Sequence, residues 1–205
     1  MKTITILGGN GKIAQDLLRE LQGDTDFKIQ LFVRNPEKLD LKGDCVFVGD
    51  ATNVDDIVKA IQNADIVYSN LGPMDTDKMI EPVLQAMAKE SKKRLIWIST
   101  LGVYDEVTFS AAATKRLKET GFISQNKYVV DKIENSDLKY TIIRPNWITY
   151  KNEVSYEVYK KGEVVKGSEV SQKSIVDLLI KILKDNSGMY VNQSLGISDP
   201  KSKAL

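Results

Sequence analysis

The chain has 205 residues, 42% of them hydrophobic and 28% charged, which is the composition of an ordinary globular protein with its own buried core. Its 29 lysines and arginines almost balance its 28 aspartates and glutamates, so we expect no basic surface for nucleic acid or an anionic membrane. The absence of histidine excludes a Ser-His-Asp triad, a Cys-His dyad and any histidine-ligated metal, and no metal is expected. The single cysteine, Cys45, excludes an internal disulfide, and its apolar neighbours predict a buried strand residue.

Residues 1–7 lead directly into a glycine cluster and lack the long apolar region of a signal peptide. No stretch of the sequence reaches the ~18 apolar residues that a membrane-spanning helix requires. One cysteine without a disulfide framework suits a reducing cytosol. We therefore expect a cytoplasmic protein, a monomer or a homodimer, whose partner is a small-molecule substrate rather than nucleic acid or a membrane.

Through the first two-thirds of the chain, short runs of β-branched residues alternate with segments in which apolar residues have helical spacing. The runs predict strands at residues 3–7, 27–33, 45–48, 66–69, 95–98 and 140–144. The periodicity predicts helices at residues 12–22, 54–61, 79–87 and 125–135, with a less regular segment at 104–124. Strands separated by helices of this length form βαβ units, whose right-handed crossovers predict an α/β fold with a doubly wound parallel sheet, a Rossmann fold.

Residues 146–205 have a different pattern. They predict short strands at 163–166 and 189–191, one amphipathic helix at 175–183 and a polar tail from residue 199. A segment of this size suffices for a small lid at the carboxyl edge of the sheet but not for a large second domain. We therefore predict that residues 1–205 form a single domain to which residues 146–205 contribute the lid.

The sharpest motif is a glycine-rich turn at residues 8–14, between the first predicted strand and the first predicted helix. It has the form G-x-x-G-x-x-A, in which Gly8 and Gly11 let the backbone approach a pyrophosphate and Ala14 lets the helix pack closely on the strand. The free amides at the start of the helix face the phosphates. The motif in this context predicts a dinucleotide site that includes Gly8, Asn10, Gly11, Lys12 and Ile13.

The end of the second predicted strand indicates which dinucleotide is bound. A site that prefers NAD usually ends this strand with an acid that accepts hydrogen bonds from the ribose 2′-OH. Here Arg34 occupies that position, and Lys38 follows four residues later. A guanidinium can hold a 2′-phosphate through two hydrogen bonds and a lysine adds a point charge, so NADP(H) is the predicted cofactor.

Six segments together resemble the atypical short-chain dehydrogenase/reductase family, in its NAD(P)H-binding (NmrA-like) branch. They are residues 8–14, 33–39, 49–51, 69–72, 98–104 and 140–145. The resemblance implies that Asp50 contacts the adenine, that Asn70-Leu71-Gly72 lines the ribose and nicotinamide side, and that residues after Pro145 cover the nicotinamide. The predicted cofactor contacts in these segments are Gly49, Asp50, Ala51, Asn70, Leu71, Gly72, Ser99 and Pro145, and Trp147 is the predicted contact that follows them.

Short-chain reductases also use a tyrosine general acid, a lysine four residues later and a serine at a strand end. Tyr128 and Lys132 have this spacing, and Ser99 follows the fifth predicted strand. Tyr128 lies only 17 residues before Pro145. Members of the family have roughly 25–30 residues between the tyrosine and this proline, so the shorter spacing here displaces Tyr128 by about two helical turns from the nicotinamide. The alternative interpretation is therefore that Tyr128 packs against the helix's neighbours and that Lys132 is solvated.

Other groups could supply the catalytic chemistry. Tyr104 is a second candidate acid, and Lys115 or Lys118 is an alternative anchor. Arg144 is expected to pair with an acid that the sequence does not identify. Trp97 is predicted to lie in the core and Trp147 to contact the substrate.

The leading functional hypothesis is an NADP(H)-dependent oxidoreductase that transfers a hydride to a small carbonyl or quinone-like acceptor. The first alternative is a non-catalytic NADP(H)-binding regulator or redox sensor, which would keep the cofactor loop without a competent acid. The second is an enzyme like the nucleotide-sugar epimerases and dehydratases, which the small C-terminal segment disfavours.

Overall fold

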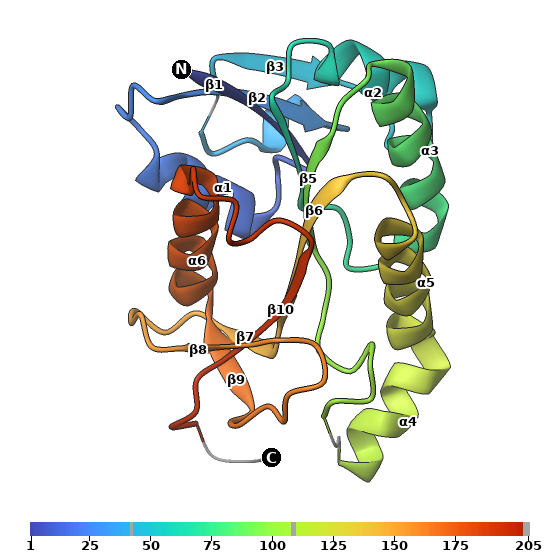
Figure 1. Cartoon of the computed structure of the whole chain (residues 1–205), viewed down its shortest axis with the longest axis vertical. Helices are drawn as coiled ribbons and strands as arrows, with labels where there is room; N and C mark the ends of the chain where they lie inside the picture. The colour runs from blue at the N-terminus through green and yellow to red at the C-terminus, as the bar shows by residue number, and fades with distance from the viewer. Residues whose placement is uncertain (42, 108–109, 203–205) are drawn as a thin grey trace. The chain divides into compact units, whose positions relative to one another are not determined.

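The computed structural model of the protein describes residues 1–41, 43–107 and 110–202. The chain forms two compact units, whose elements are labelled in Figure 1. The first unit comprises Met1–Trp97 and Ser136–Tyr140, and the second comprises Ile98–Asn135 and the chain from Thr141 onward. The chain therefore passes between the units three times.

The strands of the first unit run parallel in the order β3-β2-β1-β4-β5. They are β1 (Lys2–Leu7), β2 (Phe27–Val33), β3 (Cys45–Val48), β4 (Ile66–Ser69) and β5 (Arg94–Ile98). The connections contain the helices α1 (Lys12–Glu20), α2 (Val54–Ile61) and α3 (Thr76–Lys89), and the short 3₁₀ helix η1 (Pro36–Lys38). Because β2 and β4 lie on opposite sides of β1, the strand order reverses at β1, which makes this position a topological switch point.

The strands in the middle of this unit are buried on both faces, as parallel strands covered by helices are. Ile4, Ile6 and Leu7 of β1 are fully buried, and every residue of β4 is buried. The hydroxyl of Thr5, a polar residue within β1, lies 3.1 Å from Gln30 Oε1 and from the Ala60 carbonyl oxygen, so its burial leaves no unmet hydrogen bond at that atom.

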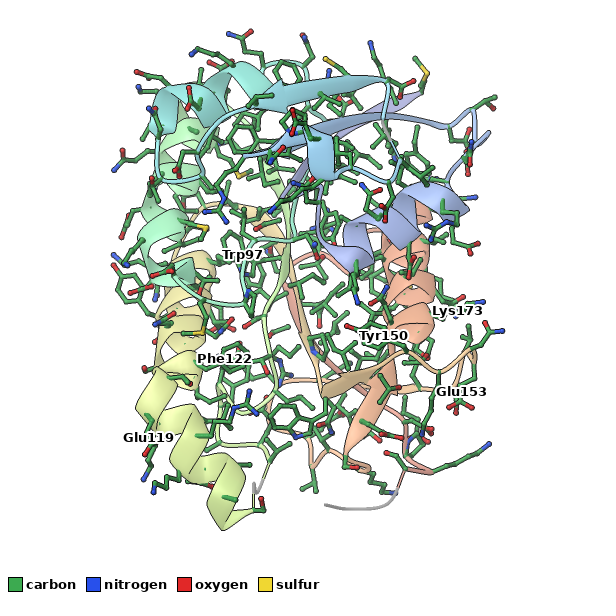
Figure 2. The ribbon with its side chains drawn as sticks, turned by 180° about the vertical axis from the view of Figure 1, so that it is seen from behind. Trp97, Glu119, Phe122, Tyr150, Glu153 and Lys173 are labelled. Carbon is green, nitrogen blue, oxygen red and sulfur yellow. The ribbon has the colours of Figure 1, made fainter. Side chains whose placement is uncertain are left out.

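Trp97 illustrates the packing of β5. It lies among the packed side chains in Figure 2 and is fully buried, which confirms its prediction as a core residue. Lys173, in contrast, points outward from its helix in the same view and is exposed.

The second unit combines the rest of the sheet strands with a small separate sheet. Its helices are α4 (Ala111–Thr120), α5 (Phe122–Glu134) and α6 (Gln172–Lys184). Its strands are β6 (Lys139–Pro145) from Thr141 onward, β7 (Trp147–Thr149), β8 (Glu157–Tyr159), β9 (Glu169–Ser171) and β10 (Gln193–Ser198). β10 pairs with β6 in parallel and with β8 antiparallel, and β7 and β9 form a two-stranded parallel sheet.

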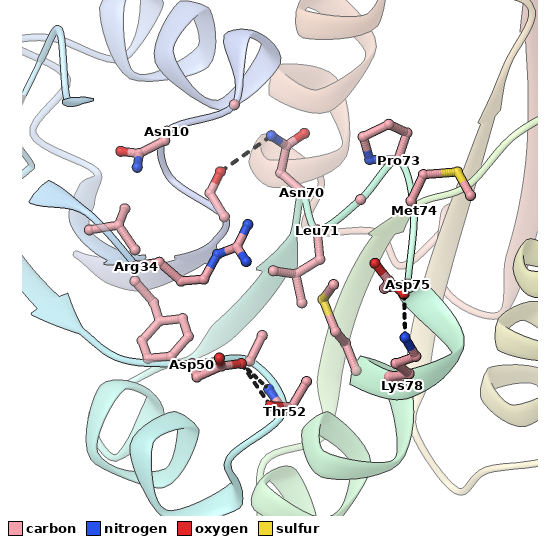
Figure 3. Close-up of a pocket in the computed structure, with 17 residues that line it drawn as sticks. Asn10, Arg34, Asp50, Thr52, Asn70, Leu71, Pro73, Met74, Asp75 and Lys78 are labelled. Carbon is pink, nitrogen blue, oxygen red and sulfur yellow. Dashed lines mark hydrogen bonds and ion pairs between the residues drawn. The ribbon is translucent and has the colours of Figure 1, made fainter.

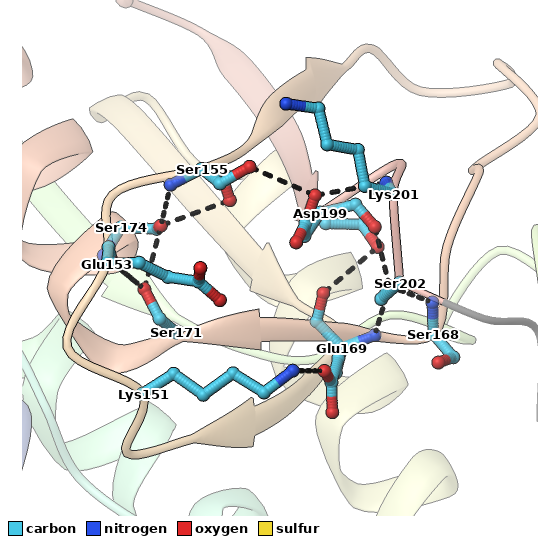
Figure 4. Close-up of polar contacts among 11 residues, drawn as sticks. Lys151, Glu153, Ser155, Ser168, Glu169, Ser171, Ser174, Asp199, Lys201 and Ser202 are labelled. Carbon is cyan, nitrogen blue, oxygen red and sulfur yellow. Dashed lines mark hydrogen bonds and ion pairs between the residues drawn. The ribbon is translucent and has the colours of Figure 1, made fainter.

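A network of serine side chains joins the segment after β7 to the start of α6 (Figure 4). Ser171 caps α6 by accepting a hydrogen bond from the Ser174 amide at 3.0 Å. Ser174 Oγ accepts from the Ser155 amide at 3.0 Å, and the Ser155 hydroxyl donates to Asp199 Oδ1 at 3.1 Å. These bonds hold residues far apart in the sequence in one arrangement within the unit.

The predicted fold class is confirmed, since the predicted strands up to residue 144 correspond to β1 to β6 of a mostly parallel α/β sheet. Cys45 does lie in a strand, but it is half-buried rather than buried. The reason is its position in β3, which is an edge strand with a neighbour on one side only.

Two strands predicted after residue 146 are wrong. Residues 163–166 form no strand, because Gly162 and Gly167 on either side have φ angles of 88° and 80° that reverse the chain direction locally. Residues 189–191 form a turn closed by a hydrogen bond from the Val191 amide to the Gly188 carbonyl. Asn192, with φ of 56°, ends this turn, and β10 begins only at the next residue.

The segment predicted as irregular, 104–124, contains the helix α4, although residues 108–109 lie outside the described residues. The polar tail predicted from residue 199 likewise lies partly outside them, at 203–205. Among the described residues, none of the helices combines the length and apolar character that a membrane crossing requires.

Candidate functional site

A pocket of about 490 Å³ lies in the first unit at the carboxyl ends of β1, β2 and β4 (Figure 3). This is the position at which open α/β sheets bind ligands. The predicted cofactor contacts that line it are Gly8, Asn10, Gly11, Arg34, Asp50, Ala51, Asn70, Leu71 and Gly72. The predicted contacts Lys12, Ile13, Lys38 and Gly49 lie close to these in the sequence but do not line the pocket.

The glycine-rich turn approaches the end of β4 so closely that it leaves no room for side chains. Gly8 has φ of 83°, and a Cβ atom there would lie 2.7 Å from the Asn70 carbonyl oxygen. A Cβ atom on Gly11 would lie 2.0 Å from Asn70 Nδ2. Gly11 is also the N-cap of α1 and supplies no capping side chain. The start of the helix is therefore left open for an anionic group.

The Asn70 side chain is held in place by its neighbours. The buried Tyr68 hydroxyl donates to Asn70 Oδ1 at 3.1 Å, and Asn70 Nδ2 donates to the Gly8 carbonyl at 3.4 Å. Burial raises the pKa of Tyr68, which keeps its phenol protonated and able to donate. Sequence reasoning missed Tyr68, because an aromatic residue in an apolar strand gives no sign that its hydroxyl faces a binding site.

Asn10 lines the pocket and has one buried side-chain atom without a partner among the described residues. Its Nδ2 atom donates to the Asn35 carbonyl at 2.9 Å, whereas its Oδ1 atom is buried and, within the described ranges, has no hydrogen-bond partner. A buried carbonyl oxygen without a partner is costly unless a ligand donates to it.

Gln15, a buried residue of α1, fixes the shape of the turn from behind. Its Nε2 atom donates to the Gly9 carbonyl at 2.7 Å, and its Oε1 atom accepts from the Leu41 amide at 2.7 Å. The glycine-rich turn and the segment after η1 are therefore tied together by one side chain. Sequence reasoning missed this residue too, although a glutamine on the apolar side of a helix was a signal that could have found it.

Arg34 and Asp50 form the polar end of the pocket. Arg34 directly follows β2 and is exposed. Asp50 Oδ1 accepts hydrogen bonds from the Thr52 amide and the Thr52 hydroxyl, both at 2.8 Å. These bonds, with a smaller contribution from the positive charge of Arg34, hold the pKa of Asp50 below its ordinary value. An ionised carboxylate and a guanidinium thus lie close together at the ends of neighbouring strands.

The predicted catalytic residues and the remaining predicted cofactor contacts belong to the second unit. The Ser99 hydroxyl donates to Oδ1 of the buried Asn126 at 3.4 Å, and Asn126 Nδ2 donates to the Phe122 carbonyl at 2.9 Å. Pro145 is buried and its carbonyl accepts from the Leu101 amide, whereas Trp147 is 41% exposed.

Tyr104 is enclosed in a cluster of charged side chains. Its hydroxyl donates to Glu134 Oε1 at 2.6 Å and lies 3.0 Å from Ser194 Oγ. The Arg144 guanidinium and the Lys161 amine lie 4.8 and 4.4 Å from its ring centroid. Burial and the hydrogen bond to Glu134 raise the pKa of Tyr104. The phenol therefore keeps its proton in a hydrogen bond to Glu134, and this geometry is unfavourable for a general acid.

The acid that pairs with Arg144 is Glu106. The two side chains form an ion pair, and Arg144 is fully buried. Arg144 also donates from Nε to Ser194 Oγ at 3.1 Å. The sequence could not identify Glu106 because it lies in the loop after β5, 38 positions before its partner.

Tyr128 and Lys132 lie on α5 with the predicted spacing. Lys132 Nζ lies 5.3 Å from the Tyr128 ring centroid, and Tyr128 is 41% exposed. Tyr128 is thus not a helix-packing residue, contrary to the alternative interpretation. Of the alternative anchors, Lys115 lies 3.9 Å from Glu119, and Lys118 lines a different pocket.

An open α/β sheet with a glycine-rich turn at its switch point defines the class of Rossmann-fold dinucleotide-binding proteins. A model of the NAD(P)H-binding family matches residues 8–186, and the chain belongs to this family. No curated protein matches the chain.

Three solved structures are similar over nearly the whole chain. A Rossmann-fold NAD(P)-binding family protein from Shigella flexneri is 31% identical, with a TM-score of 0.84, and the match covers 100% of this chain and 97% of that one. A short-chain dehydrogenase/reductase from Veillonella parvula in complex with NADP is 26% identical, with a TM-score of 0.86 and coverages of 99% and 97%. ChuY, an anaerobillin reductase from Escherichia coli O157:H7, is 16% identical, with a TM-score of 0.82 and coverages of 99% and 100%, and shares the fold.

Proposed function

We propose that the protein is an NADP(H)-dependent oxidoreductase that transfers a hydride to a small carbonyl or quinone-like acceptor. The observation that carries the choice of cofactor is Arg34, which directly follows β2 and lines the pocket where an NAD-selective site has an acid. A guanidinium suits a 2′-phosphate because it offers paired donors and a permanent charge. The NADP bound by the 26%-identical Veillonella protein supports the same choice.

The pocket fits the adenosine and phosphate portions of this cofactor. The N-cap Gly11 supplies no capping side chain, which leaves the amides at the start of α1 for a pyrophosphate. Arg34 would hold the 2′-phosphate, and Asp50 would accept a hydrogen bond from the adenine amino group. When bound, the cofactor supplies the hydride, so the protein itself needs mainly to bind and orient the reactants.

The cofactor assignment is tested by titrating the purified protein with NADPH and with NADH while following cofactor fluorescence. We expect NADPH to bind at least tenfold more tightly than NADH, and Arg34→Ala to remove about 1–3 kcal/mol of this preference. Arg19→Ala is the matched control, because Arg19 is an exposed arginine of the same unit that does not line the pocket. If NADH and NADPH bind with equal affinity, and Arg34→Ala changes neither affinity, the choice of cofactor is refuted.

A non-catalytic NADP(H)-binding regulator is the second candidate, favoured by the Tyr104 hydroxyl, which donates to Glu134 and has a raised pKa. An efficient general acid has a pKa near the working pH instead. The two candidates are separated by following NADPH absorbance with a naphthoquinone and with an aromatic aldehyde. Turnover above the protein-free rate supports the oxidoreductase, whereas tight NADPH binding without turnover of either acceptor supports the regulator.

A further inference from the structure

A second pocket, of about 510 Å³, lies within the second unit, between the segment that follows β5 and the helices α4 and α5. None of the residues that line it lines the pocket of the first unit. Its volume falls within the roughly 300–1,000 Å³ that small-molecule sites occupy. The pocket therefore has the size of a ligand site and no part in the proposed cofactor site.

Each helix contributes one face to this pocket. Thr114, Leu117 and Lys118 follow i, i+3 and i+4 spacing on α4, and Ile123 and Lys127 follow i, i+4 spacing on α5. Gly121, with φ of 65°, ends α4 and begins the turn into α5. The two helices are thus joined by a tight turn, which brings both faces to the same pocket.

A buried ion pair anchors the segment that forms the third wall. Val103 and Val107 line the pocket on either side of Glu106, whose side chain is only 4% exposed and forms the ion pair with Arg144. Glu106 Oε2 also accepts from the Tyr104 amide at 2.9 Å. A wall held by a buried ion pair loses little conformational freedom on binding, which favours affinity.

The polar groups of the pocket indicate the charge of its ligand. The aliphatic side chains Val103, Val107, Leu117 and Ile123 form an apolar lining. Lys127 is neutralised by Asp131 at 2.8 Å, whereas Lys118 is exposed and forms no ion pair with any described residue. Asp105, a carboxylate of the lining, is exposed like Lys118 and would repel an anionic head group beside it, so the head group is expected at Lys118 and away from Asp105.

We propose that this pocket binds a small amphipathic carboxylate, with its apolar body against the four aliphatic side chains and its carboxylate at Lys118. The proposal does not depend on the proposed oxidoreductase activity, since it uses no residue of the cofactor pocket. An apolar body gains from burial against aliphatic walls, and the ammonium group selects the charge of the head group.

The test compares three probes that share one apolar body and differ in head group: 4-phenylbutyrate, 4-phenylbutanol and 4-phenylbutylamine. Each is titrated into the full-length protein at low ionic strength while amide chemical shifts are followed. We expect shifts at Val103, Leu117 and Ile123, and a dissociation constant for the carboxylate about two- to fivefold lower than for the alcohol. Equal binding of all three probes, tighter binding of the amine or binding of none would overturn the proposal.

Two variants and a matched control assign the effect to the pocket. Lys118→Glu is expected to abolish the preference for the carboxylate, whereas Arg116→Glu, the same charge change on the same helix outside the lining, preserves it. Ser124→Trp is expected to fill the pocket and weaken all three probes. Equal effects of the two charge reversals would show a general electrostatic attraction and contradict the proposal. Thermal unfolding of each variant checks that it is folded. If Ser124→Trp does not fold, the comparison of Lys118→Glu with Arg116→Glu still decides the test.

Discussion

Gly11 and Asn70 are in such close contact that a single added carbon atom on Gly11 would lie 2.0 Å from Asn70 Nδ2. Gly11 itself has φ of −67°, which any residue adopts, so glycine is required there by the neighbour rather than by the backbone conformation. The turn is thus shaped by Asn70, which directly follows β4 and lies 59 positions further along the chain.

Gly11→Ala is expected to lower NADPH affinity by more than tenfold and to lower the free energy of unfolding by about 1–3 kcal/mol, because the Asn70 amide must turn away and lose its hydrogen bonds to Tyr68 and the Gly8 carbonyl. The control is Gly23→Ala. Gly23 has φ of 84° and open space around it, so this variant meets strain of about 1 kcal/mol without a clash. Calorimetric titration with NADPH and thermal unfolding measure both effects. Unchanged NADPH affinity in Gly11→Ala would contradict the role given to this contact.

Gln15→Leu keeps the volume of the side chain but leaves the Gly9 carbonyl and the Leu41 amide without their partner. The free energy of unfolding is expected to fall by about 1–3 kcal/mol, the cost of unmet buried polar groups. NADPH affinity is expected to fall as well, because the turn loses its fixed shape. Chemical denaturation measures the first effect, and Gln22→Leu, at an exposed glutamine, should leave stability nearly unchanged.

Arg144→Met leaves Glu106 buried without its cation and is expected to cost about 3–5 kcal/mol of unfolding free energy. The double variant Arg144→Met/Glu106→Leu is expected to cost less than Arg144→Met alone, because it removes both charges. A double-mutant cycle from denaturant unfolding measures the coupling. Additive effects of the two substitutions would mean that the ion pair contributes nothing beyond its separate side chains.

The lowered pKa of Asp50 gives a pH dependence with a definite sign. A carboxylate whose pKa is lower in the folded protein adds stability above its ordinary value of 3.8, and this stability is lost as the pH falls below that value. Thr52→Val removes the hydroxyl donor and keeps the amide, so it should raise the pKa of Asp50. Arg34→Ala should raise it less, because the charge of Arg34 contributes less than the hydrogen bonds. Carboxyl chemical shifts across an acid titration give both values, and a larger effect of Arg34→Ala would reverse this order.

The sequence predicted well wherever one local pattern decided the structure. The parallel strands and the glycine-rich turn were found because β-branched runs and glycine spacing are local signals. The helix α4 was missed because most of it is exposed and Leu117 is its buried apolar anchor, so no apolar stripe marks it. The strand predicted at 163–166 failed because its flanking glycines turn the chain there.

The site was predicted unevenly for the same reason. Arg34 and Asp50 follow strand ends, which periodicity locates, and both line the pocket. Gln15 and Glu106 act through contacts with residues distant in the sequence, which no local pattern encodes. Tyr68 contacts Asn70 only two residues away, but nothing in an apolar strand indicates where its hydroxyl points. The position of Tyr128 on the exposed side of α5 depends on how that helix packs, which its spacing to Lys132 does not determine.

The division of the first unit between two chain segments limits how the protein can be recombined. Ser136–Tyr140 belongs to the first unit, where the Lys139 amide donates to the Lys93 carbonyl and Arg94 donates to the Lys139 carbonyl at 3.1 Å. A fragment that ended at Trp97 would lose these bonds and leave that edge of β5 unprotected. The first unit therefore cannot be transferred to another protein as one continuous segment. A chimera must exchange its two chain segments together.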